Sequence, residues 1–229
     1  MRRFVCAGIR RILCLQSYPR PGNRDDGRVR YADGSARLFT MRSRDLVRWS
    51  KPELLRVKGP DVPERDRGRM IDPCLIRKEG WWFCFYKQNG ASSSRSRDLR
   101  TWEPVGRTQA GENVCVVRDG GCYWMLHSPK NGLRFKRSSD LLNWTDASGE
   151  ITLGQRNWAW ARGRLTAGFL LDARSVPGVG KWVLFFHGSG PKTEEEGDFD
   201  RNASIGLALA DSLADYYTPF EVVARDDGM

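Results

Sequence analysis

The chain has 229 residues, of which 38 are Lys or Arg and 28 are Asp or Glu, so its formal net charge is +10. An apolar fraction of 40% and nine Trp exclude a disordered chain, since such chains are poor in aromatic residues. No run of 18 apolar residues is present, so no membrane-spanning helix is expected. A chain of this length can bury a core without disulfides or metals, and we expect one domain over residues 1–229.

The first residues, MRRFVCAGIRRILCLQ, carry two Arg inside their apolar stretch, whereas a signal peptide needs an uninterrupted one. As written, the sequence is therefore expected to be cytoplasmic; the location is open if the natural N-terminus lies upstream. Arg residues are spread along the whole chain, without a basic helix, a zinc finger or an RNA-binding motif. We therefore expect neither a nucleic-acid partner nor a membrane partner.

The Cys residues are better explained as small buried side chains than as a disulfide framework or a metal site. They are Cys6, Cys14, Cys74, Cys84, Cys115 and Cys122. Most lie inside apolar runs such as WWFCFY, and none forms a C-x-x-C pair or has a His at zinc-ligand spacing. No metal site and no cofactor are predicted, and a bound cation is left open.

A hairpin pattern recurs along the chain. In the second and third units an apolar strand opens at Asp72 or Glu112, and a turn with Gly and an aromatic strand follow. The spacing is also the same, with 15 positions from Asp72 to Lys87 and 15 from Glu112 to His127.

A seven-residue motif, S-x-D-L-x-x-W, ends each unit. Its copies begin at Ser43, Ser96, Ser138 and, with Tyr in place of Trp, at Ala210. Ser and Asp side chains bond backbone N–H groups in turns, so the motif predicts a structural turn. Its Trp is expected to pack between neighbouring units.

Repeating units of about 40 residues with several strands are typical of a β-propeller, because one blade cannot cover its own faces. The sequence therefore predicts an all-β propeller. Four blades are visible, at about residues 2–49, 72–102, 112–144 and 167–216.

The first strand of each propeller blade lines the central axis, so residues that open these strands should converge. Asp72 and Glu112 are predicted to hold this place in adjacent blades, and glycoside hydrolysis needs two carboxyl groups of this kind. Acidic residues at strand starts are also common without any catalytic role. Spacing alone does not separate the two interpretations.

The Ile71-Asp72-Pro73 opening, the aromatic second strand and the S-x-D-L-x-x-W ending together resemble the five-bladed β-propeller glycoside hydrolases, above all glycoside hydrolase family 43. The resemblance covers nearly the whole chain. It implies an inverting hydrolase acting on arabinofuranosyl or xylosyl linkages of plant-type polysaccharides. Glu112 would be the general acid, and Asp72 would orient that acid and tune its pKa. The implied partner is a carbohydrate, and the oligomeric state is not predicted.

Two features depart from that family. Asn113-Val114 follows Glu112 where a small residue and Pro usually stand, and counting places Arg2 where an Asp general base is expected. A guanidinium cannot accept a proton from water, because its pKa lies above about 12. Either the base lies upstream or the activity is impaired. The alternatives are a non-catalytic carbohydrate-binding propeller and a propeller glycoside phosphorylase, in which phosphate replaces water.

Four further residues are predicted to contact substrate. His127 and His187 both end an aromatic strand, in WMLH and LFFH, and are expected in corresponding places. Trp158 and Arg164 lie in the segment that leads to the fourth blade. An indole can stack on a sugar ring and a guanidinium can donate to hydroxyls, although packing between blades explains the Trp equally well.

Overall fold

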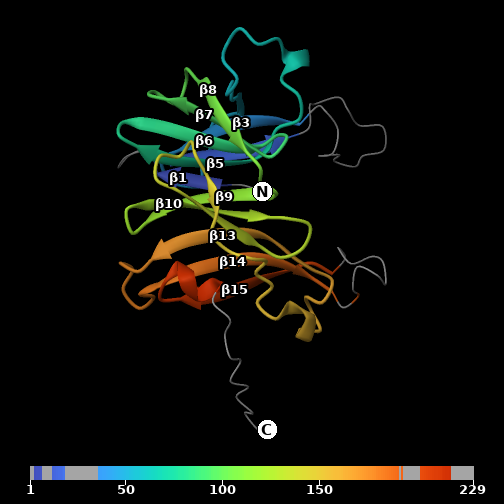
Figure 1. Cartoon of the computed structure of the whole chain (residues 1–229). Helices are drawn as coiled ribbons and strands as arrows, with labels where there is room; N and C mark the ends of the chain where they lie inside the picture. The colour runs from blue at the N-terminus through green and yellow to red at the C-terminus, as the bar shows by residue number, and fades with distance from the viewer. Residues whose placement is uncertain (1–2, 7–11, 19–35, 191, 193–201, 218–229) are drawn as a thin grey trace.

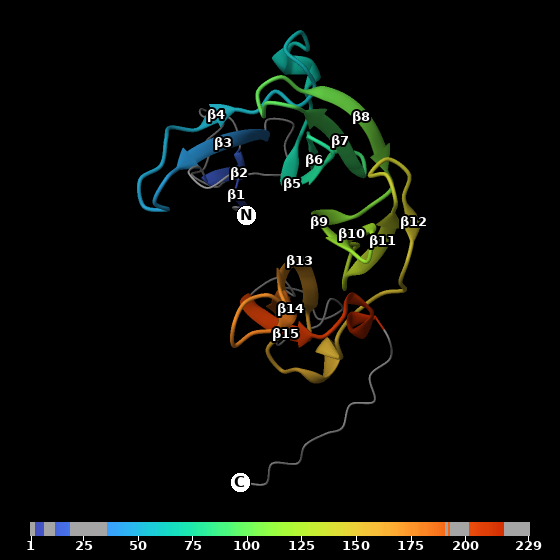
Figure 2. The same cartoon turned by 90° about the vertical axis from the view of Figure 1, so that its left-hand side faces the viewer.

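The structure, a computed structural model, describes residues 3–6, 12–18, 36–190, 192 and 202–217, with only the backbone described for the first two stretches. These residues form four antiparallel sheets (Figure 1). Figure 2 shows the sheets fanned around a common centre, in the order in which they occur along the chain. This arrangement is that of a β-propeller, and it confirms the predicted fold class.

Within each sheet the strands follow one another in chain order. Sheet 1 contains β1 (Arg3–Cys6), β2 (Ile12–Tyr18), β3 (Arg37–Ser43) and β4 (Glu53–Leu54). Sheet 2 contains β5 (Ile71–Lys78), β6 (Trp81–Lys87), β7 (Ala91–Ser96) and β8 (Glu103–Thr108). Sheet 3 contains β9 (Glu112–Asp119), β10 (Cys122–Ser128), β11 (Arg134–Ser138) and β12 (Thr145–Asp146). Sheet 4 contains β13 (Arg164–Ala173), β14 (Lys181–Ser189) and β15 (Ser204–Ala210). The first strand of each sheet lies nearest the common centre in Figure 2.

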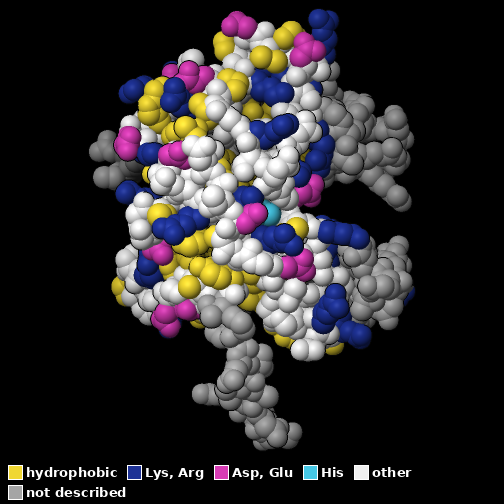
Figure 3. All heavy atoms as spheres, in the orientation of Figure 1, with side chains coloured by type: hydrophobic (Ala, Val, Ile, Leu, Met, Phe, Trp, Pro, Cys, Tyr) yellow, Lys and Arg dark blue, Asp and Glu magenta, His cyan; other side chains and the backbone are white. Residues whose placement is uncertain are grey.

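Helical structure in the described residues is limited to three 3-10 turns, η1 (Glu64–Asp66), η2 (Gln155–Asn157) and η3 (Leu213–Tyr216). None of these turns is long and apolar enough to cross a membrane. On the face shown in Figure 3, Lys and Arg side chains are scattered among acidic ones, as the spread of charge along the sequence predicts.

A fourth strand follows the S-x-D-L-x-x-W turn in the first three sheets, whereas the predicted unit ended at the turn. These strands are β4, β8 and β12, and two of them are only two residues long. As outermost strands they are largely exposed, so no alternation of apolar residues marks them in the sequence. The unit is therefore a four-stranded blade in sheets 1 to 3.

The turn motif has the predicted structural role. In sheet 2, Ser96 Oγ accepts the N–H groups of Asp98 and Leu99 at 3.2 and 2.9 Å, and Asp98 Oδ1 accepts those of Arg100 and Thr101 at 2.8 Å each. The backbone donors lower the pKa of Asp98 to about 2, the N–H of Thr101 having the largest effect. The corresponding turns of sheets 1 and 3 make the same bonds.

Apolar side chains fill the space between successive sheets. Trp102 of the motif is only 3% exposed and lies in the core between sheets 1 and 2 with Leu38 and Leu75. Tyr216, its counterpart in the altered fourth copy, is 4% exposed and lies in the core between sheets 3 and 4. These positions confirm the predicted packing between units for Trp102 and Tyr216, whereas Trp49 of the first copy is only partly buried and belongs to none of the described core clusters.

Two buried Cys residues also connect successive sheets. Cys74 Sγ accepts the N–H of Val116 at 3.3 Å, and Cys115 Sγ accepts the N–H of Leu170 at 3.4 Å. Cys74 and Cys115 are 6% and 2% exposed, so they are the small buried residues that the sequence predicts. The side chains of the two Cys residues in sheet 1 lie outside the described part of the chain.

Candidate active site

The inner strands of sheets 2, 3 and 4 share a distortion near their first residues. In each one, the pairing with the second strand shifts, as in a β-bulge. One residue of each bulge has left-handed backbone geometry: Asp72 with φ 53°, Asn113 with φ 56° and Ala167 with φ 54°. The repeated bulge defines which residues correspond from sheet to sheet.

This register corrects the correspondence inferred by counting. Asp72 matches Asn113, and Glu112 matches Ile71, which pairs with Lys87 as Glu112 pairs with Ser128. The count went wrong by one residue because it matched Lys87 with a His instead of with Ser128. Asp72 and Glu112 nevertheless lie on neighbouring inner strands at the same end, as predicted.

A hydrogen bond connects the two acidic positions through the backbone. Asp72 is 9% exposed, and its Oδ2 accepts the N–H of Asn113 at 3.0 Å. Glu112 directly precedes Asn113, so the Asp72 carboxylate holds the stretch of backbone that carries the Glu112 side chain. A buried acceptor also satisfies the N–H of a bulge residue, which the sheet pairing leaves open.

Glu112 remains accessible beside a cation. Its side chain is 41% exposed, and Oε1 lies 3.8 Å from the Nη2 of Arg69, which precedes β5. An ion pair between groups this exposed contributes little to stability. Lys87 adds a second cation nearby, since its Nζ donates to the carbonyl of Ala110 at 3.3 Å. The buried carboxylate of Asp72 and the cations Arg69 and Lys87 thus all lie near the start of β9.

His127 lies beneath the start of β9. Its Nδ1 accepts the N–H of Gly111 at 3.1 Å, so the neutral ring carries its proton on Nε2. Nε2 is buried without a hydrogen-bond partner in the described part of the chain, and the side chain is 5% exposed. Burial, followed by the charge of Lys136, lowers the pKa of His127 to about 4. The ring is therefore neutral at physiological pH, and it contacts the residue that precedes Glu112.

His187 and Arg164 lie on sheet 4, at the same end of the strands. His187 pairs with Thr166, which makes it the counterpart of Ser128, whereas His127 corresponds to Phe186. The two His residues therefore do not occupy corresponding places, contrary to the prediction.

Arg164 is the first residue of β13. Its Nε donates to the carbonyl of Lys130 at 3.0 Å, so it helps to join sheets 3 and 4. The structure thus groups Asp72, Glu112 and His127 around the start of β9. Substrate contact by His187 and Arg164 stays a prediction.

Trp158 belongs to an aromatic stack. It lies parallel to Trp160, with ring centroids 5.6 Å apart and 6° between the planes, and both rings stack on Phe186 at 6.0 Å. Gly188 and Gly206 leave the space for Trp160, since an added Cβ would approach its ring to 2.4 and 2.8 Å. Packing against sheet 4 accounts for Trp158. Its predicted contact with sugar stays a prediction.

Two residues near the acids were not predicted. Gly111 leaves no room for a side chain, because a Cβ would lie 1.6 Å from the carbonyl oxygen of Ser128. Arg69 could have been noticed as a cation three residues before Asp72. Arg2 lies outside the described residues. Within them, no group of three or more His, Cys, Asp or Glu residues could hold a metal ion.

No protein-family model matches the chain, and no curated protein matches it by sequence. Solved structures match its fold. An exo-1,5-α-L-arabinanase from a bovine ruminal metagenomic library has a TM-score of 0.58 at 14% identity, over 93% of this chain and 71% of that one. The catalytic domain of the GH62 α-L-arabinofuranosidase of Coprinopsis cinerea has a TM-score of 0.63 at 12% identity, over 93% of this chain and 64% of that one.

A third match belongs to the GH130 family of mannoside phosphorylases, which contains glycoside hydrolases that target β-1,2-mannosidic linkages in Candida mannan. Its TM-score is 0.57 at 17% identity, over 91% of this chain and 65% of that one. The chain thus has the fold of the β-propeller glycosidases, and it spans about two thirds of the length of these three solved chains, 64% to 71%. The comparisons support a likeness in fold to propeller glycosidases as a class, and they do not single out family 43.

Proposed function

We propose that the chain is a carbohydrate-active propeller that cleaves glycosidic bonds, with Glu112 as the general acid and Asp72 as the residue that positions it. The bond from Asn113 N–H to Asp72 Oδ2 carries the proposal, because it ties a buried carboxylate to the residue after Glu112. The Glu112 side chain is 41% exposed, as a group that reaches a glycosidic oxygen has to be. Arabinofuranosyl linkages are the first substrate class to test, given the names of two solved relatives in fold, and xylosyl linkages the second.

In the proposed reaction, protonated Glu112 gives its proton to the oxygen between the sugar and the leaving group. The bond between that oxygen and the anomeric carbon breaks, and the leaving group departs as an alcohol. Water attacks the anomeric carbon from the opposite face and loses a proton to a general base. The resemblance to family 43 implies a base on the first inner strand, whose side chains lie outside the described part of the chain.

Replacement of Glu112 by Gln tests the acid. With aryl arabinofuranosides of poor leaving groups, we expect Glu112→Gln to lower kcat about 10²–10⁴-fold, because Gln has no proton to donate. The loss should shrink for good leaving groups, which need little protonation. Glu79→Gln, at the exposed turn between β5 and β6, is the matched control and should keep full activity. An equal loss for good and poor leaving groups contradicts the acid role.

Phosphorolysis is the second candidate, favoured by the two cations near Glu112. Arg69 Nη2 lies 3.8 Å from Glu112 Oε1, and Lys87 reaches the backbone two residues earlier. Cations so placed suit a phosphate that attacks in place of water. Turnover that requires added phosphate and yields a sugar 1-phosphate would support this candidate over hydrolysis. Saturable sugar binding without either reaction would instead support a binding protein.

A further inference from the structure

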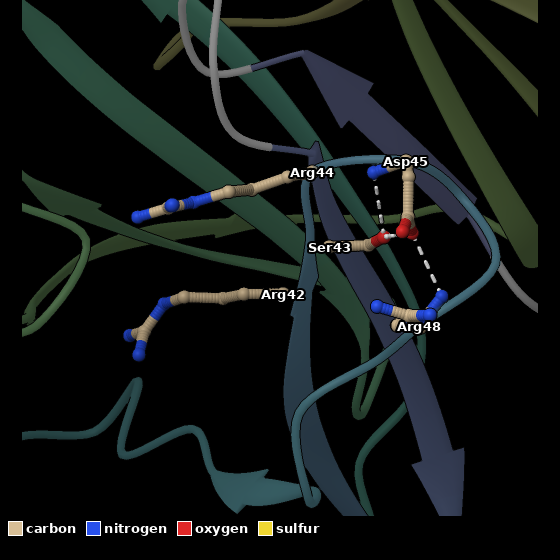
Figure 4. A pocket seen from close by; sticks show the side chains of 5 residues that line it. All are labelled: Arg42, Ser43, Arg44, Asp45 and Arg48. Atoms are coloured by element: carbon tan, nitrogen blue, oxygen red, sulfur yellow. Dashed lines mark hydrogen bonds between the residues drawn. The ribbon is translucent and has the colours of Figure 1, made fainter.

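A pocket at the end of β3 lies apart from the candidate active site. Its volume is about 430 Å³, within the range of roughly 300–1,000 Å³ that is typical of small-molecule sites. Its lining residues are Arg42, Ser43, Arg44, Asp45 and Arg48 (Figure 4). The third strand of a sheet ends away from the start of the first strand, so the pocket lies at the opposite end of the sheets from the paired acids.

The pocket has an excess of positive charge. The turn itself uses the Asp45 carboxylate, which accepts backbone N–H groups, including that of Arg48 at 2.8 Å; these donors hold the pKa of Asp45 below its usual range. Arg42 pairs with Glu53 at 3.0 Å. Within the described part of the chain, the guanidinium groups of Arg44 and Arg48 have neither an acceptor nor a carboxylate partner.

The corresponding turn of sheet 2 shows how Arg42 and Arg44 could contact one ligand together. Arg95 and Arg97 occupy the places of Arg42 and Arg44, and their guanidinium groups lie over the ring of Trp81 at 4.4 and 4.2 Å. The turn thus presents two guanidinium groups to one partner. In Figure 4, Arg42 of β3 and Arg44 of the turn that follows likewise extend in the same direction, and no ring lies against them in the described residues.

The third arginine is not needed by the turn. In sheets 2 and 3, the side chains at the place of Arg48 strengthen the turn: Thr101 donates to Asp98 Oδ2 at 3.4 Å, and Asn143 donates to Asp140 Oδ2 at 2.7 Å. Among the described residues, Arg48 makes only the backbone bond of this position. Its guanidinium is therefore available for a ligand in the pocket.

We infer that this pocket binds a small molecule through a tetrahedral oxyanion, a phosphate or sulfate group bound by the arginine side chains that line it, Arg42 and Arg44 on one side and Arg48 on the other. Guanidinium groups offer paired N–H donors that match the oxygens of such anions, and a charge-assisted bond is stronger than a neutral one. The pocket is larger than one anion needs, so it also has room for the rest of a ligand such as a sugar phosphate. This inference does not depend on the proposed reaction.

Calorimetric titration of the full chain tests it, with inorganic phosphate, inorganic sulfate and glucose 6-phosphate as separate probes at constant ionic strength. We expect saturable binding that the double variant Arg44→Gln/Arg48→Gln weakens about tenfold or more. Arg97→Gln/Arg100→Gln is the matched control, since it removes the same charge from the corresponding turn of sheet 2. Binding by this control should stay within about twofold of the unmodified chain.

All four of these arginines are exposed, so both double variants should fold, and their melting temperatures check this. Tighter binding of glucose 6-phosphate than of phosphate would support a phosphorylated small molecule as the ligand, and equal binding would support the free ion. Absence of saturable binding overturns the inference. Equal weakening in the two double variants overturns it as well, because it would show only general attraction to a chain of net charge +10.

Discussion

The packed contacts, or joints, between sheets 2 and 3 and between sheets 3 and 4 share one hydrogen-bond acceptor and differ in another. A buried thiol accepts a backbone N–H across each joint in the same register. The bulge N–H, however, is accepted by the carboxylate of Asp72 at Asn113 and by the hydroxyl of Ser128 at Ala167, at 3.0 and 2.8 Å. Because a neutral hydroxyl is enough to hold one bulge, the fold does not require a carboxylate at the other. Under the proposed function, the charge of Asp72 has a use that the fold alone does not require, since it positions Glu112.

The largest difference between sheets 3 and 4 themselves should appear at Gly111, just before β9. A Cβ there would lie 1.6 Å from the carbonyl oxygen of Ser128, whereas the matching residue of sheet 4 is Leu165, which carries a side chain. We expect Gly111→Ala to lower the free energy of unfolding by about 3 kcal/mol or more, measured by urea denaturation. Gly149→Ala is the control, since an added Cβ there meets no atom within 4 Å. Equal stability of the two variants would contradict the close approach at β9.

The second difference is a pH dependence that only the joint with His127 should have. The folded chain holds the pKa of His127 at about 4, chiefly through burial, against about 6.5 in an unfolded chain. Below pH 6.5 the unfolded state therefore binds the proton more readily. Stability should be greatest above pH 6.5 and fall by about 3 kcal/mol as the pH drops through 4.

Thermal unfolding measured between pH 4 and pH 7 checks this expectation. His127→Phe, which copies the Phe186 of sheet 4, should remove most of the slope. His187→Gln is the matched control and has to keep the slope if His127 is its source. A slope that survives in His127→Phe would place the titrating group elsewhere.

The smallest expected effect is the loss of stability when either acceptor of a bulge N–H, Asp72 or Ser128, is removed. Asp72→Ala and Ser128→Ala should each cost about 1–3 kcal/mol, since each leaves a bulge N–H unsatisfied. Under the proposed function, only Asp72→Ala should also lower kcat, because only that residue positions the acid. Unfolding and turnover measured on the same preparations separate the two effects. Loss of turnover in Ser128→Ala as large as in Asp72→Ala would make Asp72 a structural residue only.

The repeat made the fold predictable from the sequence. The S-x-D-L-x-x-W turn and the aromatic second strand place their apolar residues between sheets, so their spacing reports the packing of Trp102 and Phe85 directly. The outermost strands were missed because they are short and exposed. No periodicity of buried residues distinguishes them from loops.

The candidate site was only partly predictable. That Asp72 and Glu112 share one end of adjacent strands follows from the repeat, but their register does not, since a bulge changes the count without changing the hydrophobic pattern. Arg69 and Gly111 acquire their roles from contacts with residues more than fifteen positions away. Those contacts depend on how neighbouring strands and neighbouring sheets pack against each other. The spacing of residues within one unit does not encode that packing.

The two thiols that accept a backbone N–H from the next sheet allow the rate at which neighbouring sheets separate to be measured. Cys74 and Cys115 are 6% and 2% exposed, so an alkylating reagent reaches either one only after its joint has separated. Cys122, in the β9–β10 hairpin, is partly exposed and reacts without such an event. Cys84 is a third buried thiol among the described side chains, and its Sγ donates within its own strand, to the carbonyl of Phe85. At high reagent concentration the slow labelling rates of Cys74 and Cys115 equal the opening rates of their joints, each read separately. Since an alkylated sulfur no longer fits against the neighbouring N–H, each opening that is captured becomes permanent.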